Sequence, residues 1–191
     1  MCIRDRYELL WKELFIKCAN TGKPLVFSIG MAMIDEIKNA LSTIIGYRTK
    51  NIAVLKCTSA YPTPYNEANL EAISTLKREL KPFEDKYNLS IGYSDHTVTP
   101  SVIYRAVHKY GCNLIEFHLD IDGKGEEYKA GHCWLPDQIK EVIDTVNKGI
   151  EADGTGTIGP TPSELNDRDW RADPEDGLRP LKEMRKTFIG D

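Results

Sequence analysis

The chain has 191 residues, 41% of them hydrophobic, and a formal net charge of −4 at pH 7, which fits a single domain with a hydrophobic core. Lys and Arg are spread along the chain, whereas a nucleic-acid-binding protein needs a clustered basic face. No apolar run reaches the roughly 18 residues of a membrane helix, so we expect neither nucleic acid nor a membrane as a partner.

The first half of the chain alternates helical and strand patterns. Residues 7–20 place apolar side chains at helical spacing and end at the segment TGKP, which predicts a helix closed by a glycine cap. The β-branched and aromatic run at residues 24–30 indicates a buried strand. Residues 33–46 repeat apolar side chains with a helical period, and residues 51–59 form a second strand-like run.

The second half continues the same alternation. Residues 67–87 have a helical pattern with a proline near its end, and residues 89–94 indicate a third strand. Residues 100–110 predict a helix with proline in its first turn. Residues 113–119 indicate a fourth strand, and residues 136–149 a further helix.

The two ends of the chain differ from this alternating part. Residues 151–191 are rich in Gly, Pro, Asp and Thr, which predicts an irregular tail. At the other end, MCIRD resembles the translation of a transposon mosaic end that is used in sequencing libraries. We therefore interpret residues 1–6 as a sequencing artefact and residues 7–150 as part of a domain that begins upstream in a longer gene product.

The strand–helix repeats predict a parallel sheet with right-handed crossovers. Four such units fit either half of a (β/α)₈ barrel or a small doubly wound sheet, and the loop after the first strand lacks the G-x-G-x-x-G pattern of a dinucleotide fold. In a barrel the active site lies where the strands end. Polar residues gather at the four strand ends: Ser28, Thr58, Ser59, Ser94, Asp95, His96, Glu116 and His118.

Two histidines at neighbouring strand ends are the candidate metal ligands. The imidazoles of His96 and His118 can bind a divalent transition metal if their nitrogens converge, and Asp95 and Glu116 could be ligands, supports for a ligand or bases. Glu116 and His118 are two residues apart on one strand and point to the same side. The alternative is two unrelated, hydrogen-bonded histidines. His132 lies in the following loop, where functional residues concentrate.

Three serines at strand ends, Ser28, Ser59 and Ser94, could bind a phosphate together with backbone amides of the following helices. Alternatively, each hydroxyl caps its own helix. The five cysteines include no C-x-x-C pair. We therefore interpret them as reduced thiols in a cytoplasmic protein.

The segments GKPLVFSIGM, CTSAYPTPY, IGYSDHT and IEFHL follow one another in order. In these segments the chain resembles the N-acetylneuraminate (sialic acid) synthase family, over residues 7–150. Family members are (β/α)₈ barrels. The resemblance therefore implies an α/β fold that is the C-terminal half of a TIM barrel, with four βα units and an irregular C-terminal tail.

The resemblance also implies roles for the strand-end residues. The family's two metal-binding histidines fall on His96 and His118, with Mn²⁺ or Mg²⁺ as the cofactor. Its phosphoenolpyruvate-contacting serines fall on Ser28 and Ser94, and a position that is often Asn in the family is Ser59.

The remaining implied roles concern the sugar and the water. The tyrosine that lines the family's sugar site falls on Tyr61, and the acid before the second histidine falls on Glu116, a candidate for handling the metal-bound water. Asp95, beside the first histidine, is a further candidate for substrate binding.

The implied reaction joins phosphoenolpyruvate to an N-acetylated amino-sugar aldehyde. The metal polarises the aldehyde, the enol carbon attacks it, water adds to the resulting oxocarbenium centre, and phosphate leaves by C–O cleavage. The serines hold the phosphate so that the reacting carbons stay close. Homodimers are usual in the family, so we expect the full-length protein to be a homodimer.

One segment departs from the family pattern. LDIDGKGEEYKAGHCWLP keeps a glycine and His132 but offers no clear match to the family's substrate-contacting acid; Asp120, Asp122, Glu126 and Glu127 are the available acids. This departure keeps two alternatives open, a 3-deoxy-sugar-phosphate synthase-like barrel enzyme and a non-catalytic carbohydrate-binding relative. A half barrel has open sheet edges, so we expect the 191-residue chain alone to be inactive.

Overall fold

The computed structural model describes the backbone of residues 2–4 and 6–189 and the side chains of residues 7–187. The chain divides into two compact units, Met1–Ala152 and Asp153–Asp191. The first unit contains every candidate site residue, and the second corresponds to the segment predicted to be an irregular tail.

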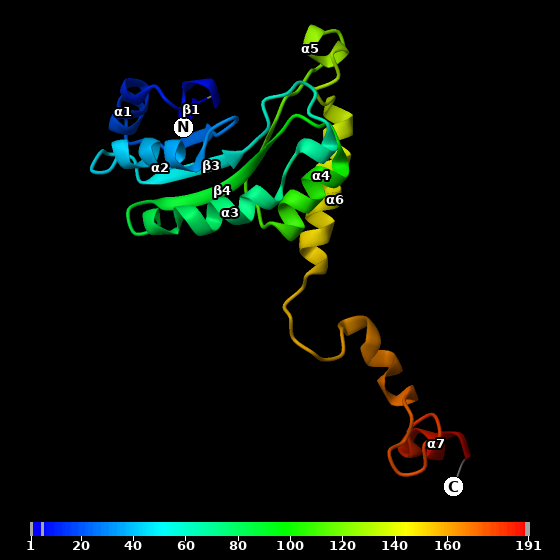
Figure 1. Ribbon diagram of the computed structural model, residues 1–191. Coiled ribbons are helices and arrows are strands. Elements are labelled where there is room, and N and C mark those ends of the chain that lie inside the picture. Colours follow the sequence, from blue (N-terminus) through cyan, green and yellow to red (C-terminus); the bar gives the residue numbers. More distant parts are fainter. Residues whose placement is uncertain (1, 5, 190–191) are drawn as a thin grey trace. The chain divides into compact units, whose positions relative to one another are not determined.

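The first unit is built on a curved, five-stranded parallel sheet (Figure 1). Its strands follow one another in chain order, and each pairs in parallel with the next. The strands are β1 (Cys2–Arg4), β2 (Leu25–Ser28), β3 (Asn51–Lys56), β4 (Asn88–Asp95) and β5 (Ile115–Phe117). Parallel strands in sequential order, joined by helices, are the arrangement of half a (β/α)₈ barrel.

The four strands predicted from the sequence are confirmed as β2 to β5. The additional strand, β1, pairs with β2 through residues that the sequence analysis set aside as an artefact. Met1 and Asp5 of that segment lie outside the described residues, and the interpretation of residues 1–6 stays a prediction.

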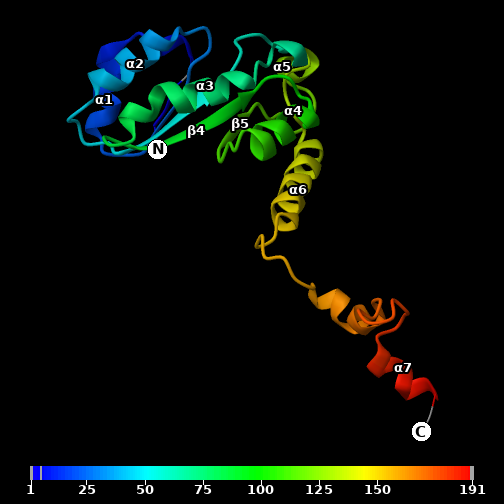
Figure 2. The ribbon, with the colours of Figure 1, turned by 60° about the horizontal axis from the view of Figure 1, so that its bottom comes forward.

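Helices connect the strands, and α1, α2 and α3 lie along one face of the sheet (Figure 2). The α-helices of this unit are α1 (Lys12–Asn20), α2 (Ile34–Thr43), α3 (Glu71–Leu80), α4 (Pro100–Tyr104), α5 (Glu126–Lys129) and α6 (Pro136–Ala152). Shorter turns are η1 (Arg6–Glu8), η2 (Tyr65–Glu67), η3 (Lys81–Phe83) and the π-helical η4 (Arg105–Lys109) that continues α4.

Two helices differ from the expected spans. The pattern at residues 67–87 predicts one helix, but α3 ends at Leu80 and a 3₁₀ turn with Pro82 follows, because proline has no N–H to continue the α-helical ladder. The four-residue helix α5 lies in a segment for which the sequence predicted no helix. It carries Glu127, which belongs to the site described below.

Alternate residues along the strands face two different environments. Phe27, Val54 and Tyr93 belong to the large core that also contains side chains of the helices. Leu55, on the opposite face, packs in a separate small cluster with Leu114. Because side chains alternate along a strand, Ser28, Ser94 and Glu116 have the parity of this second cluster, on the concave face of the half barrel.

Gly92 shows how closely the strands approach on the concave face. A Cβ at this position would lie 2.4 Å from the carbonyl oxygen of Leu114 and 2.6 Å from Cδ2 of Leu55. Any side chain would therefore push against the backbone that leads into β5. Glycine at position 92 allows β4 and β5 to keep the register that pairs Ser94 with Glu116.

The second unit is more regular than predicted. It contains the 3₁₀ helix η5 (Pro162–Trp170) and the helix α7 (Lys182–Ile189), two helical segments within the span predicted to be an irregular tail. The physical reason is local capping. The Glu164 carboxylate accepts hydrogen bonds from the N–H and the hydroxyl of Thr161, both at 2.7 Å, and Asp173 accepts the N–H of Lys182 at 2.7 Å, where α7 begins.

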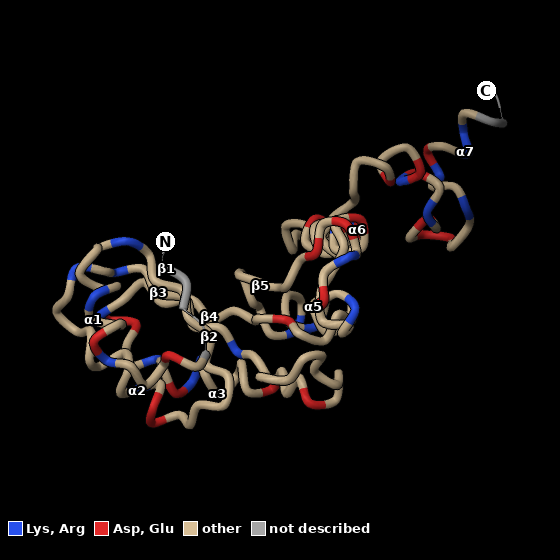
Figure 3. Tube along the Cα trace, turned by 90° about the horizontal axis from the view of Figure 1, so that it is seen from above, with Lys and Arg blue, Asp and Glu red and all other residues tan. Residues whose placement is uncertain are grey.

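Basic and acidic residues both occur throughout the first unit (Figure 3). Some of them pair, as Lys38 and Glu79 do at 2.7 Å. Among the helices of the described chain, none combines the length and the apolar character needed to cross a membrane.

Candidate active site

His96 anchors the site at the end of β4. The side chain is buried, and its Nδ1 lies 2.7 Å from the carbonyl oxygen of Thr58. A carbonyl can only accept, so Nδ1 carries the proton and Nε2 presents its lone pair. Nε2 lies 3.4 Å from the hydroxyl of Ser94. This is the arrangement of a metal-binding histidine, whose second nitrogen donates to a carbonyl that fixes the ring.

The loop after β3 holds His96 from the other side. The N–H of Thr63 donates to the carbonyl of His96 at 2.8 Å. The buried Lys56 ammonium donates to the carbonyl of Cys57 at 2.7 Å and to the hydroxyl of Thr58 at 3.1 Å. Burial lowers the pKa of Lys56, although Cys57 opposes this effect. Lys56, to which the sequence assigned no role, therefore supports the loop that orients the histidine.

Tyr61 lies among three histidine rings. Its ring centroid is 4.7 Å from that of His96, 5.6 Å from that of His118 and 4.9 Å from that of His132. The rings of His96 and His118 are themselves 5.2 Å apart, and those of His118 and His132 are 5.4 Å apart. The structure therefore brings the two predicted metal ligands together and adds His132, which the sequence left without a role.

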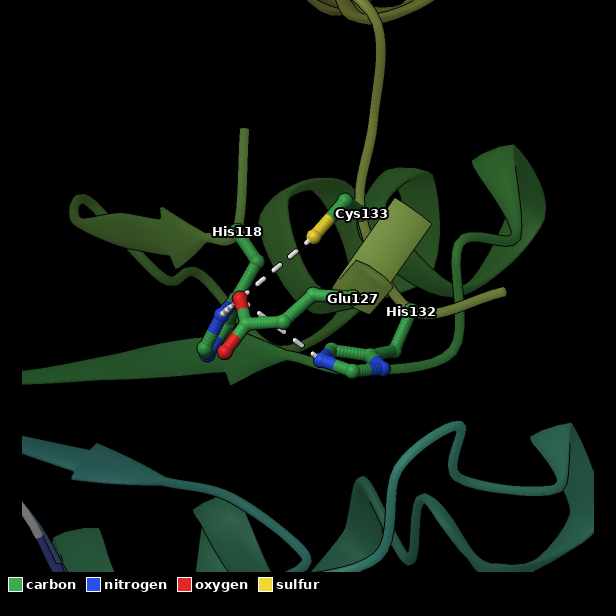
Figure 4. A group of neighbouring side chains, drawn as sticks. All are labelled: His118, Glu127, His132 and Cys133. Atoms are coloured by element: carbon green, nitrogen blue, oxygen red, sulfur yellow. Dashed lines mark hydrogen bonds and ion pairs between the residues drawn. The ribbon is translucent and has the colours of Figure 1, made fainter. Parts of the chain in front are cut away.

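A second group of side chains lies around His118 (Figure 4). It consists of His118, Glu127, His132 and Cys133, and their ligand atoms all lie within 4.8 Å of one another. Oε2 of Glu127 is 3.4 Å from Nδ1 of His118, 3.8 Å from Nε2 of His132 and 3.8 Å from Sγ of Cys133. We call these four residues the His–Glu–His–Cys cluster.

Burial sets the protonation of the two enclosed members of this cluster. Burial lowers the pKa of His132, and the negative charge of Glu127 only partly opposes this. The neutral imidazole is therefore favoured. Burial also raises the pKa of the Cys133 thiol, and the neighbouring Glu127 carboxylate raises it further. Without a cation, the thiol stays protonated.

Asp95 connects the two parts of the site. Its Oδ1 accepts the N–H and the hydroxyl of Thr97 at 3.1 and 2.7 Å, and its Oδ2 accepts the N–H of Val98 at 3.2 Å and the indole N–H of Trp134 at 3.0 Å. These four bonds occupy a fully buried carboxylate. Its contacts within the chain are those of a structural residue, and the predicted contact with substrate stays a prediction.

The three serines and Glu116 lie where the sequence predicted, near the strand ends. Ser28 ends β2, Ser94 is the penultimate residue of β4, and both are buried. Glu116 is half-buried and pairs in register with Ser94. The Ser59 hydroxyl is buried and has no hydrogen-bond partner among the described residues. A buried hydroxyl without a partner is costly, so Ser59 is suited to bind a ligand oxygen.

The backbone next to His96 is strained. Val98 has a φ of +48°, a conformation that is unfavourable for a β-branched residue. The hydrogen bond from its N–H to Asp95 holds it in place. Strain of this kind is typically retained near functional sites.

The residues at the strand ends fit a divalent transition metal. His96 has its proton fixed on Nδ1 by Thr58, and the His118 ring lies near it on the neighbouring strand. Imidazole nitrogens are better ligands for manganese than for magnesium, which prefers oxygen. Of the two metals that the resemblance implies, the donor set therefore favours Mn²⁺.

Comparison with known proteins identifies the family of the chain. The model of the NeuB family matches residues 6–157. The chain belongs to this family. The match includes every strand-end residue considered above and the whole His–Glu–His–Cys cluster.

The chain has curated relatives that are named synthases. It is 35% identical to the N,N'-diacetyllegionaminic acid synthase of Campylobacter jejuni over 144 residues, covering 73% of this chain and 40% of that protein. It is 32% identical to the N-acetylneuraminate-9-phosphate synthase of Homo sapiens over 151 residues, covering 78% and 39%. The chain thus spans about two fifths of the length of these relatives.

Solved structures confirm the half-barrel fold. The N-acetylneuraminic acid synthetase of Leptospira borgpetersenii matches with a TM-score of 0.69 at 27% identity, covering 86% of this chain and 55% of that one. The spore coat polysaccharide biosynthesis protein SpsE of Bacillus subtilis matches with a TM-score of 0.69 at 25% identity, covering 88% and 49%. The phospho-2-dehydro-3-deoxyheptonate aldolase of Thermotoga maritima, with a TM-score of 0.59 at 16% identity over 80% of this chain and 46% of that one, shares the fold alone.

Sequence reasoning missed two members of the cluster. Cys133 was interpreted only as a reduced thiol, and Glu127 was one of four acids with no assigned role. The signal that could have identified them is the adjacent pair His132–Cys133, five and six residues after an acid, in the loop that follows a strand ending in histidine.

Proposed function

We propose that the protein to which this chain belongs condenses phosphoenolpyruvate with an N-acetylated amino-sugar aldehyde to form a nonulosonic acid of the sialic acid type. The observation that carries the proposal is the convergence of His96 and His118, whose rings lie 5.2 Å apart, beside serines at neighbouring strand ends. Membership of the NeuB family and the names of the Campylobacter and human relatives support the same reaction class.

In this proposal the serines bind phosphoenolpyruvate. Ser28 and Ser94 are buried at strand ends on the concave face, and the unpartnered hydroxyl of Ser59 gains a hydrogen bond when a ligand oxygen arrives. Fixing the phosphate and carboxylate holds the enol carbon near the aldehyde carbon, which lowers the entropic part of the barrier.

The histidines, Tyr61 and Glu116 serve the second substrate and the water. Bound by His96 and His118, a divalent cation supplies Lewis acidity for the aldehyde carbonyl. Tyr61, packed among the histidine rings, lines the sugar side. The enol carbon forms a bond to the aldehyde carbon, whose oxygen takes up a proton. Glu116 accepts a proton from the water that adds to C2 of the former enol. The bond from C2 to the phosphate oxygen then breaks, and the new C2 hydroxyl passes its proton to the departing phosphate as it becomes the keto group.

The proposal concerns the whole protein, of which the chain spans about two fifths when measured against its curated relatives. We propose that the full-length protein completes the barrel and acts as a homodimer. Asp95 is retained as a residue that positions the end of β4, since its four hydrogen bonds lie within the chain.

The test is a phosphate-release assay on the full-length protein, with phosphoenolpyruvate, Mn²⁺ and a panel of N-acetylated amino sugars. We expect release only when a sugar aldehyde is present, and a loss of at least about 100-fold in kcat for His96→Gln, in line with the loss of a group that acts on the reacting carbonyl. His108→Gln is the matched control, because His108 is exposed on η4. Folded, metal-loaded protein that releases no phosphate with any sugar would overturn the proposal.

A further inference from the structure

The His–Glu–His–Cys cluster has spacings that its own hydrogen bonds do not explain. The three distances from Oε2 of Glu127, to His118, His132 and Cys133, are 3.4, 3.8 and 3.8 Å. Ordinary N–H···O hydrogen bonds span about 2.7–3.2 Å. The Glu127 carboxylate therefore lies near three possible partners, but farther from each than an ordinary hydrogen bond.

These separations match the edges of a coordination tetrahedron. Zinc binds imidazole nitrogen and carboxylate oxygen at about 2.0–2.2 Å and thiolate sulfur at about 2.3 Å, which places tetrahedral ligands about 3.3–3.8 Å apart. The remaining pairs in the cluster are all within 4.8 Å. The pairs that do not include Glu127 close from at most 4.8 Å to this spacing when an ion binds.

The ring of the buried His132 is poorly paired within the chain. Nδ1 of His132 is buried without a hydrogen-bond partner among the described side chains and backbone, and Nε2 is 3.8 Å from the nearest carboxylate oxygen. Burying an imidazole nitrogen that makes no hydrogen bond lowers the stability of the fold. Nε2 faces Glu127 (Figure 4), so an ion bound in the cluster gives Nε2 a partner and leaves the proton on Nδ1.

The backbone holds the cluster residues in place before any ligand binds. The N–H of Trp134 donates to the carbonyl of His118 at 2.9 Å, and the N–H of Asp120 donates to the carbonyl of Trp134 at 2.9 Å. This pairing sets Cys133 beside His118. The Asp120 carboxylate accepts the N–H groups of Gly123 and Gly125 at 2.6 and 2.9 Å, which turns the chain back so that α5 brings Glu127 to the other three.

We propose that His118, Glu127, His132 and Cys133 form a tetrahedral site for a soft divalent cation of the Zn²⁺ type. Thiolate and imidazole donors select zinc over Mg²⁺ or Mn²⁺, and the carboxylate and thiolate together neutralise its two charges. The thiol gives up its proton on binding. The site contains three residues outside the predicted pair of His96 and His118, and it does not depend on the proposed synthase reaction.

Sharing His118 has a chemical consequence. A neutral imidazole has one lone pair and one N–H, and Nδ1 of His118 faces Glu127. The ring therefore serves either the cluster or a cation next to His96, so we expect one zinc ion per chain rather than two.

Co²⁺ replacement with absorption spectroscopy tests the site on purified, metal-stripped full-length protein. We expect a thiolate-to-cobalt charge-transfer band that is absent in Cys133→Ser, and displacement of cobalt by one equivalent of Zn²⁺. Loss of a supporting residue outside the ligand set typically weakens metal binding about 10- to 100-fold, so loss of a direct ligand in His132→Gln should weaken zinc binding by at least about 100-fold.

Matched controls separate the cluster from its surroundings. Glu127→Gln, at a side chain that is 65% exposed and so unimportant for folding, should weaken zinc binding, whereas Glu126→Gln and His108→Gln should not. His96→Gln should keep the charge-transfer band even though it abolishes the proposed synthase activity, so the two proposals fail separately. A folded protein without the band, or equal zinc binding by Glu127→Gln and Glu126→Gln, would refute the site.

Discussion

The two histidine-bearing ends of the site are built in different ways. His96, at the end of β4, is buried and has Nδ1 bonded to a backbone carbonyl at 2.7 Å, next to an aspartate with four hydrogen bonds. Around His118, the ring and the Glu127 carboxylate are partly open to solvent, with side-chain exposures of 28% and 65%, and the contacts are longer.

The difference separates preorganisation from ligand capture. The β4 end is held by hydrogen bonds within the chain and should keep its geometry with or without ligands. The cluster around His118 has ligand atoms within 4.8 Å of one another, and its Glu127 contacts are longer than ordinary hydrogen bonds, so its geometry should tighten only when an ion binds. Substitution of Asp95, which holds the β4 end in place, should therefore lower stability, whereas substitution of Glu127 in the cluster should leave stability unchanged and weaken metal binding.

The largest expected effect is on stability, at Asp95. Asp95→Ala removes the carboxylate that accepts four hydrogen bonds. One of these comes from the indole N–H of the buried Trp134. Leaving several buried donors unpaired should lower the free energy of unfolding by about 3–5 kcal/mol. Urea unfolding of the metal-free protein measures this loss.

Glu127→Ala completes the comparison under the same conditions. Its exposed carboxylate makes only long contacts, so the free energy of unfolding should change by no more than about 0.5 kcal/mol. Asp122→Ala, another exposed acid of the same loop, is the control. The comparison would fail if Asp95→Ala lowered the free energy of unfolding by less than about 1 kcal/mol, or if Glu127→Ala lowered it as much as Asp95→Ala does.

A smaller effect is expected at Gly92, which sets the distance between β4 and β5. Gly92→Ala places a methyl group 2.4 Å from a backbone oxygen, so the strands must move apart, at a cost of about 2 kcal/mol in the free energy of unfolding. Gly159→Ala is the control, because a Cβ there meets no described atom within 4 Å. Thermal unfolding of both variants measures the difference, and equal midpoints would contradict the close packing.

Periodic and local features of this site were predictable from the sequence. The four strands are short apolar runs, and the two-residue spacing of Glu116 and His118 places them on one side of the sheet. Strand order then brings His96 and His118 to one edge, because consecutive parallel strands end together. The break after Leu80 was harder to place, since a proline shows that a helix is disturbed but not where it ends.

The His–Glu–His–Cys cluster could not be derived in the same way. Glu127 reaches His118 only because Asp120 turns the chain and Trp134 pairs with the end of β5. These are tertiary contacts of a loop without any repeating pattern. The capping that makes the second unit partly helical depends in the same way on particular side chains, Thr161 with Glu164 and Asp173 with Lys182, within a composition that is typical of loops.

The smallest expected effect is a pH dependence at Lys56, which supports the β4 end through Thr58. Burial lowers the pKa of Lys56 below its ordinary 10.5, with a smaller opposing effect from Cys57. The folded state therefore binds the proton less tightly than the unfolded state. Below the folded-state pKa the charged amine reduces stability, and this loss diminishes as pH rises from that pKa towards 10.5.

Lys56→Met removes this titration but also removes the two hydrogen bonds to Cys57 and Thr58. The informative quantity is therefore the difference in the free energy of unfolding between the wild type and Lys56→Met, measured by urea unfolding at several pH values. We expect the wild type to gain stability relative to Lys56→Met as pH rises towards 10.5, because the buried Lys56 amine loses its charge and Met has no charge to lose. Lys50→Met, at an exposed position before β3, should show no such shift. A constant difference for Lys56→Met across this range would mean that its ammonium is as well accommodated in the fold as in water, and that the β4 end is less enclosed than its hydrogen bonds indicate.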